Sequence, residues 1–203
     1  MNFGFRLPNA KLITHKDMIS ASLDLFSVSL IQGIFLASPM SKAVAVFLAR
    51  WAIYLFLIPI LYFVKTRKQD LHHAVAEAAW GGGVALILTT VMAYFLQRPR
   101  PYIDASGIAL LIPSPLNTSF PSGHTAASFA IAFAILYADK RWGIFALVLA
   151  CSIALGRIAV GVHYPSDIVG GVLVGFASFA LVRFMHGELT RRDVAPHNGK
   201  AKR

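Results

Sequence analysis

The sequence predicts an all-α polytopic membrane protein, with six transmembrane helices in one bundle. Two features of the composition indicate this class: 57% of the 203 residues are apolar, and only 14% are charged. Soluble domains average about 45–50% apolar and about 25% charged residues. The apolar excess is gathered in long segments, close to the roughly 20 residues that a helix needs to cross a bilayer. The six expected spans cover residues 20–38, 43–64, 74–96, 123–138, 142–162 and 166–185.

The first three expected spans each contain charged or polar residues. Residues 20–38 form the weakest span, because Asp24 and other polar residues interrupt it. Residues 43–64 contain Arg50, and a charge inside a span needs a partner or a polar cavity. We interpret Asp24 and Arg50 as a structural ion pair across the bundle. Glu77 lies one turn inside the third span, where we expect it to pair or to reach the interface.

Each of the last three spans begins or ends at a polar motif. Ser122 is placed to cap the fourth span, since a serine before an apolar helix can accept from free backbone N–H groups. Arg157 lies about one turn before the end of the fifth span, and Pro165 suits the first turn of the sixth. The expected organisation is a cytoplasmic N-terminal segment, the membrane domain and a disordered basic cytoplasmic tail, at residues 1–19, 20–185 and 186–203.

The chain is strongly basic, with 19 basic and 9 acidic residues and a net charge of +10. In a soluble protein this charge would indicate nucleic-acid binding. Here most basic residues lie in short loops and in the tail, so we expect contacts with membrane lipids and no nucleic-acid partner. With the N-terminus in the cytoplasm, the positive-inside rule is met by 14 of the 19 basic residues: Arg6, Lys11, Lys16, Lys65, Arg67, Lys68, Lys140, Arg141, Arg183, Arg191, Arg192, Lys200, Lys202 and Arg203.

This orientation places three polar stretches, residues 96–102, 121–124 and 156–167, at the outer face. Basic residues on that side oppose the general charge bias, and an anionic substrate would explain them. The second stretch, Pro-Ser-Gly-His, combines a helix start, which can bind an anion, with a proton carrier, His124. Gly123 lets a ligand approach the backbone closely. An ordinary interfacial cap with a hydrated histidine is the structural alternative.

The third stretch combines Arg157, His163 and Asp167. Residues four apart share a helix face, so the Asp167 carboxylate can hold the tautomer of His163 and leave its other nitrogen as base or nucleophile. A cation at Arg157 is costly inside a span unless it faces a polar cavity or a partner. The structural alternative is a His–Asp pair that caps a helix.

The first stretch alternates Arg98 and Arg100 with prolines. The forked guanidinium groups of arginine suit phosphate oxygens. The structural alternative is that these arginines anchor the chain at the membrane interface. Taken together, the stretches bring arginines, histidines, a carboxylate and a helix N-terminus to one face, which is the set that phosphoryl transfer requires. No cluster of cysteine, histidine or carboxylate residues in the sequence indicates a metal site.

These motifs resemble those of the type 2 phosphatidic acid phosphatase family of integral-membrane lipid phosphatases, whose pattern is K-x6-R-P, P-S-G-H and S-R-x5-H-x3-D. The second motif is complete at residues 121–124. The third matches over residues 157–167, with Gly156 in place of the serine. The first matches only at residues 100–101, and Ala93 stands where the family has its lysine.

The resemblance implies a role for each matched residue. His163 would attack phosphorus and form a phosphohistidine, and Asp167 would orient it. His124 would protonate the leaving oxygen and then activate water. Arg98 would replace the charge of the missing lysine. The phosphate-binding residues would be Arg98, Arg100, Ser122, Gly123 and Arg157. No metal or other cofactor is implied.

The short chain and small outer loops are similar to those of the bacterial undecaprenyl-diphosphate phosphatases of this family. This similarity implies hydrolysis of undecaprenyl diphosphate, a long-chain isoprenoid lipid, to undecaprenyl phosphate for cell-wall carrier recycling. The enzyme would lie in the bacterial cytoplasmic membrane, with both termini in the cytoplasm and the active site in the periplasm. Phosphatidylglycerophosphate, phosphatidic acid and lipid A are alternative substrates for the same mechanism. A non-catalytic lipid-phosphate binder or carrier is the alternative from another class, motivated by Ala93 and Gly156.

Overall fold

The structure is a computed structural model that describes residues 15–66, 69–113 and 118–194. These residues form helices and connecting segments, with one isolated bridge between Pro99 and Thr118. The elements in chain order are α1 (His15–Leu36), α2 (Pro39–Arg50), the 3-10 helix η1 (Ala52–Phe56), α3 (Leu57–Lys65), α4 (Gln69–Leu96), α5 (Pro101–Asp104), α6 (Gly123–Ala138), α7 (Lys140–Ala159) and α8 (Pro165–Val194). The prediction of an all-α protein is confirmed.

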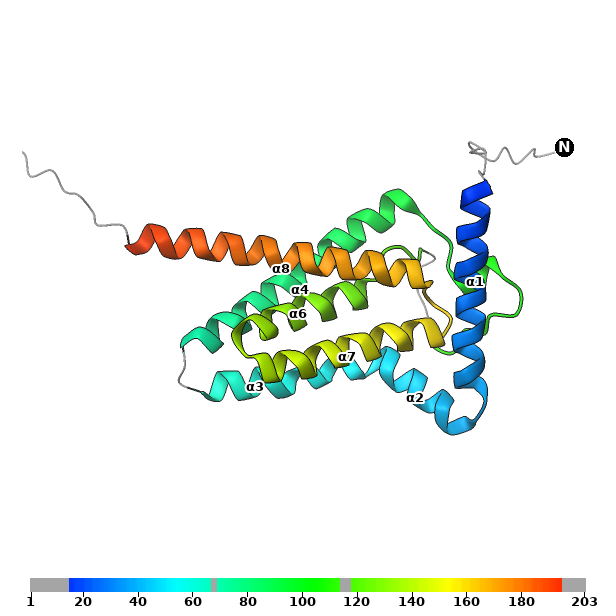
Figure 1. Cartoon of the computed structure of the whole chain (residues 1–203), viewed down its shortest axis with the longest axis horizontal. Coiled ribbons are helices and arrows are strands. Elements are labelled where there is room, and N and C mark those ends of the chain that lie inside the picture. The colour runs from blue at the N-terminus through cyan, green and yellow to red at the C-terminus, as the bar shows by residue number, and fades with distance from the viewer. Residues whose placement is uncertain (1–14, 67–68, 114–117, 195–203) are drawn as a thin grey trace, which may run out of the picture.

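Helices α4, α6, α7 and α8 run along the long axis of the molecule, and α1 runs across one end of them (Figure 1). Helix α6 packs against α4, α7 and α8. Small side chains permit this close packing of apolar helices. The fully or almost fully buried alanines of α6 are Ala126, Ala127, Ala130, Ala132 and Ala134.

Three helical segments are long and apolar enough to cross a membrane: Leu71–Leu96, Lys140–Ala159 and Pro165–Gly187. A fourth candidate is the pair Pro39–Arg50 and Ala52–Lys65, which is bent by 59°. Two further apolar helical segments are shorter, Ser22–Leu36 and Gly123–Ala138. The described residues therefore contain three candidate spans, or four with the bent pair, inside the region where the sequence predicts six.

The second expected span, over residues 43–64, lies within the bent pair and is divided between two helices. Helix α2 ends at Arg50, and a 3-10 segment precedes α3. Pro59 explains the irregular turn, because its ring clashes with the carbonyl four residues earlier and it has no N–H to donate there. That carbonyl belongs to Leu55, which lies within the 3-10 segment.

Helix α1 differs in direction from the neighbouring helices, although the sequence predicts that its residues form a span. One of its polar side chains, Gln32, is turned inward. Gln32 is 2% exposed, donates to the carbonyl oxygens of Ala109 and Ala159, and accepts from the Ala109 N–H. The polar residues that weaken this segment as a span therefore attach α1 to the end of the bundle.

Glycines in α8 allow it to approach the first turn of α6. A Cβ at Gly171 would lie 2.8 Å from the carbonyl oxygen of Ser122, and one at Gly175 would lie 2.5 Å from that of Ala126. Any larger residue at these positions would push the helices apart. This contact holds the start of α8 beside the start of α6, where two of the motifs lie.

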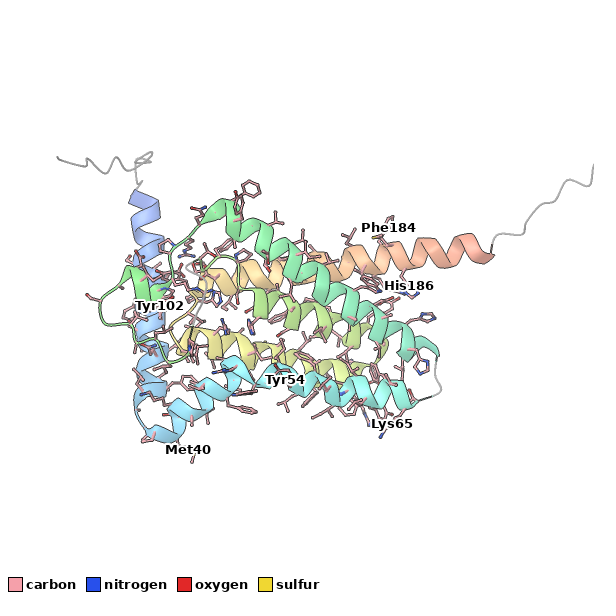
Figure 2. The ribbon with its side chains drawn as sticks, turned by 180° about the vertical axis from the view of Figure 1, so that it is seen from behind. Met40, Tyr54, Lys65, Tyr102, Phe184 and His186 are labelled. Carbon is pink, nitrogen blue, oxygen red and sulfur yellow. The ribbon has the colours of Figure 1, made fainter. Side chains whose placement is uncertain are left out.

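The opposite end of the bundle carries a separate polar cluster. Glu77 is 3% exposed and pairs with Arg183 at 2.9 Å and with Nδ1 of His186 at 2.7 Å. The expectation that Glu77 pairs is confirmed. Figure 2 shows Lys65 and His186 at this end and Tyr102 at the end crossed by α1.

Candidate active site

Four helix termini meet at the end of the bundle crossed by α1. Helix α4 ends at Leu96, α6 begins at Gly123, α7 ends at Ala159 and α8 begins at Pro165. Consecutive helices of the bundle run in opposite directions (Figure 1). The three polar stretches adjoin these termini, and Tyr102, within the first of them, marks this end in Figure 2.

A cavity of about 980 Å³ lies between these termini. Among the described residues, its lining includes three arginines and two histidines and no carboxylate. Its polar and charged lining side chains are Arg50, Thr89, Thr90, Tyr94, Gln97, Arg100, Thr118, His124, Arg157 and His163. Within the described part of the chain, no three histidine, cysteine or carboxylate side chains gather in a way that could hold a metal ion. The cavity is suited to an anion.

His163 lies between α7 and α8, with its imidazole paired to a carboxylate. Its Nδ1 is 3.5 Å from Oδ2 of Asp167, and the two side chains are 4% and 0% exposed. This distance is long for a hydrogen bond but within ion-pair range, and Oδ2 also accepts from the Tyr164 N–H at 2.8 Å. The predicted pairing is confirmed. Asp167 occupies the Nδ1 side of the ring, which leaves Nε2 for chemistry in the cavity.

Burial lowers the pKa of His163 to about 4. The Asp167 carboxylate opposes this effect, and the positive charges of Arg157 and Arg100 reinforce it. The ring is therefore neutral at pH 7, which is the form with a lone pair for attack on phosphorus.

Ser122 caps α6, as predicted. Its Oγ accepts from the N–H of Thr125 at 3.4 Å and shares a 2.9 Å hydrogen bond with the Thr125 hydroxyl. Its backbone N–H donates to the carbonyl oxygen of Asp167 at 3.1 Å. Ser122 is fully buried and does not line the cavity, whereas Gly123 and His124 do. The serine therefore fixes the helix start beside the His163 segment and leaves the next two residues facing the cavity.

Arg100 and Arg157 line the cavity, and backbone carbonyls of neighbouring elements hold their side chains. Nη1 of Arg100 donates to the carbonyl oxygen of Val162 at 2.8 Å, and Nη1 of Arg157 donates to that of Ala49 at 3.2 Å. Both residues are buried. Nε of Arg157 has no hydrogen-bond partner among the described residues. A buried guanidinium with a free donor in an arginine-lined cavity is suited to a phosphate oxygen.

Arg98 does not line the cavity, in contrast to the role that the resemblance implies for it. Its Nη1 donates to Oδ1 of Asp167 at 2.8 Å, and its Nη2 donates to Oδ2 of Asp24 at 2.8 Å. The guanidinium lies 4.1 Å from the ring centre of Tyr164. Arg98 therefore contacts the carboxylate behind His163, which makes it a positioning residue.

We expect Arg98→Gln to lower kcat by about tenfold and to change KM by less than threefold, because the variant loosens Asp167 without removing a cavity cation. Steady-state phosphate release measures both constants. Arg183→Gln is the matched control, since Arg183 also pairs with a carboxylate and stacks on a tyrosine, but at the other end of the bundle. A large rise in KM with unchanged kcat would instead place Arg98 at the phosphate.

Asp24 pairs with Arg98, so the predicted pair between Asp24 and Arg50 is wrong. The reason is geometric. Asp24 lies on α1 next to the start of α8, where it also accepts from the backbone of Ser166. Arg50 instead lines the cavity, and sequence reasoning did not assign it to the site. The sequence does hold a sign of this role, because a charge within an apolar segment indicates either a polar cavity or an ion pair.

Comparison with known proteins identifies the family of this chain. The profile of the PAP2 superfamily matches residues 74–191, which include all three motifs. The bacitracin transport permease protein BcrC of Bacillus licheniformis is 33% identical over 143 residues, which cover 70% of each chain. The undecaprenyl-diphosphatase BcrC of Bacillus subtilis is 30% identical over 158 residues, covering 73% of this chain and 79% of that protein.

The fold is also similar to a solved structure, that of Aquifex aeolicus LpxE. The TM-score is 0.67 at 26% sequence identity, over 80% of this chain and 95% of that one. This structural match agrees with the all-helical bundle. The chain belongs to the PAP2 superfamily of membrane phosphatases.

Proposed function

We propose that this membrane phosphatase hydrolyses undecaprenyl diphosphate to undecaprenyl phosphate through a phosphohistidine at His163. The observation that carries the proposal is the setting of His163. It has a carboxylate on one side and, on the other, an arginine-lined cavity whose described lining residues include no carboxylate. The relative named undecaprenyl-diphosphatase BcrC supports the choice of substrate.

In the first step, Nε2 of His163 attacks the terminal phosphorus, and the bond from that phosphorus to the bridging oxygen breaks. The bridging oxygen leaves with its electron pair as part of undecaprenyl phosphate and takes a proton from His124. Arg100 and Arg157 hold the oxygens of the transferred group, and the first turn of α6 adds backbone N–H groups near Gly123. Asp167 stabilises the positive charge that develops on the His163 ring.

In the second step, His124 removes a proton from water, and the water oxygen attacks the same phosphorus. The P–N bond breaks, its electron pair returns to Nε2 of His163, and inorganic phosphate leaves. Both histidines regain their starting protonation states, so the cycle balances without any other group.

The apolar tail of the substrate lies along α4 in this proposal. Leu86 and Tyr94 both line the cavity, and they are 49% and 72% exposed. A phosphate bound among the arginines would therefore continue into an apolar surface that faces lipid. This arrangement favours a lipid phosphate over a soluble phosphate ester.

The deciding experiment measures phosphate release by the purified protein in detergent with EDTA present. Undecaprenyl diphosphate, phosphatidic acid and phosphatidylglycerophosphate are compared, each at several concentrations. We expect the highest kcat/KM with the diphosphate. Faster release from a glycerolipid would retain the mechanism and change the substrate. Binding of the diphosphate without any phosphate release would support the alternative of a lipid-phosphate carrier.

We further propose that the site faces the outer side of the membrane and that the end near Lys65 and Lys140 faces the cytoplasm. In this placement α1 lies along the outer surface of the bilayer and adds no crossing. Its exposed apolar side chains share one face, as in interfacial helices. They are Leu23, Phe26, Leu30 and Ile34. Six alternating spans would instead place the start of α1 in the cytoplasm.

A cysteine placed at His15, in a Cys151→Ser background, tests this orientation. We expect a membrane-impermeant maleimide to label it in intact cells, as it should label a cysteine placed at Ile103 beside the site. A cysteine at Lys140 is the cytoplasmic control and should react only after the cells are opened. Protection of the His15 position in intact cells would show that α1 crosses the membrane.

A further inference from the structure

We propose that Arg50 is a phosphate-binding residue that supplies the cation missing at position 93. This inference rests on the proposed function, since it concerns how the same cavity holds a phosphate group. Arg50 is the last residue of α2, and its side chain lines the cavity together with Arg100 and Arg157.

Arg50 has no carboxylate partner among the described residues. Asp24, the partner that the sequence suggested, is held by Arg98 and by the segment around Ser166. The guanidinium of Arg50 lies 5.4 Å from the ring centre of Trp51, which orients it without neutralising its charge. Arg50 is exposed and lines a cavity whose described lining holds no carboxylate, so its guanidinium is available to an anion there, and the substrate of a phosphatase provides one.

The break after Arg50 explains how the side chain reaches the cavity. In a continuous helix over residues 43–64, Arg50 would lie in the middle of a membrane span. Here α2 ends at Arg50, and the chain turns by 59° into the following helix. The bend places Arg50 at the end of a helix beside the cavity.

Gly156 allows this end of α2 to lie close against α7. A Cβ at Gly156 would lie 2.7 Å from the Cβ of Leu48 and 2.8 Å from the N of Ala49. The next residue, Arg157, donates to the carbonyl oxygen of Ala49 at 3.2 Å. A serine at position 156 would therefore push α2 away from α7, and with it Arg50 away from Arg157.

Ala93 lies on α4 and lines the same cavity as Arg50. The two departures from the motif pattern are thereby connected. Without a lysine at position 93 the cavity lacks one cation, and the glycine at position 156 admits a helix that delivers another. In this proposal Arg50, whose position Gly156 allows, takes the place of the lysine that is absent at Ala93.

The first test measures binding of inorganic pyrophosphate by calorimetry to the full-length protein in detergent. We expect Arg50→Ala to weaken binding about tenfold, the loss typical of one charged hydrogen-bonding partner. Lys42→Ala is the matched control, since Lys42 lies on the same helix but does not line the cavity. Unchanged pyrophosphate binding by Arg50→Ala would overturn the inference.

The second test is rescue by the family's own residue. Ala93→Lys in the Arg50→Ala background should restore pyrophosphate binding to within about threefold of wild type, because the cation returns to the same cavity from the other side. Gly156→Ser alone should weaken binding as Arg50→Ala does. If the double variant folds, as judged by its elution on size exclusion, but binds no better than Arg50→Ala, then Arg50 acts through structure and the inference fails.

The outcomes separate this inference from the proposed function. Pyrophosphate binding does not depend on turnover or on the identity of the lipid. If the wild type hydrolyses no lipid phosphate, yet binding falls in Arg50→Ala and returns in the double variant, the proposed function fails and the role of Arg50 stands. If the wild type hydrolyses undecaprenyl diphosphate and Arg50→Ala binds pyrophosphate normally, the proposed function stands and the role of Arg50 fails.

Discussion

His163→Ala is expected to reduce phosphate release on the order of 10⁴-fold or more, because the variant removes the atom that forms the bond to phosphorus. The expected loss is in kcat, and the arginines that line the cavity remain to bind the lipid. Release of inorganic phosphate from the preferred lipid measures the effect. His72→Ala is the control, since His72 lies near the start of α4 at the other end of the bundle and should leave the rate unchanged.

The pH dependence of the wild type adds a second check on His163. Its pKa of about 4 means that the ring stays neutral down to about that pH. Protonation of the His163 ring removes the lone pair that attacks phosphorus. As far as His163 determines it, the rate of phosphate release is therefore full well above pH 4 and falls as the pH decreases through 4. An acid limb of kcat/KM near pH 6.5, the ordinary pKa of histidine, would contradict the buried setting of the ring. Normal release by His163→Ala would overturn the mechanism itself.

The local parts of the site could be predicted from the sequence because short spacings determine their geometry. Ser122 caps α6 and His163 pairs with Asp167, as expected from residues three or four apart near helix starts. Capping and pairing across one turn depend on little beyond the helix itself. The meeting of the motifs at one end followed from the alternating direction of apolar helices.

The assignment of each arginine could not be predicted in this way. Arg98 and Arg100 are two residues apart and each precedes a proline, but only Arg100 of the two lines the cavity. Arg98 is turned away by Asp24, a partner 74 residues distant along the chain. That contact depends on α1 crossing the end of the bundle, which hydropathy does not encode. The same contact removes Asp24 as a partner for Arg50.

The break in the second span is a related case. Every residue between Trp51 and Val64 except Pro59 is apolar and compatible with a helix, so hydropathy is equally high for a straight or a bent segment. A proline within a span is often accommodated by neighbouring helices. Hydropathy also does not report the close packing of α2 against α7 at Gly156, which is a tertiary contact.

His124→Gln is the second variant with a large expected effect, and its outcome distinguishes the two chemical steps. We expect turnover to fall by about 10²–10⁴-fold, the usual contribution of a positioned acid–base group. The leaving group from a diphosphate is itself a phosphate ester, which is stable as an anion and needs little help from an acid. The attack of water on the phosphohistidine has no such advantage, because the water must lose a proton.

With undecaprenyl diphosphate labelled in its terminal phosphate, His124→Gln should therefore accumulate label on the protein. The label should be stable to base and lost in acid, as a P–N bond is, and should approach one group per chain. The double variant His124→Gln, His163→Ala should carry none. With a lipid monoester the leaving group is an alkoxide, so the first step also needs the acid and no label should accumulate. Label with neither substrate, together with wild-type turnover, would show that His124 takes no part in either proton transfer.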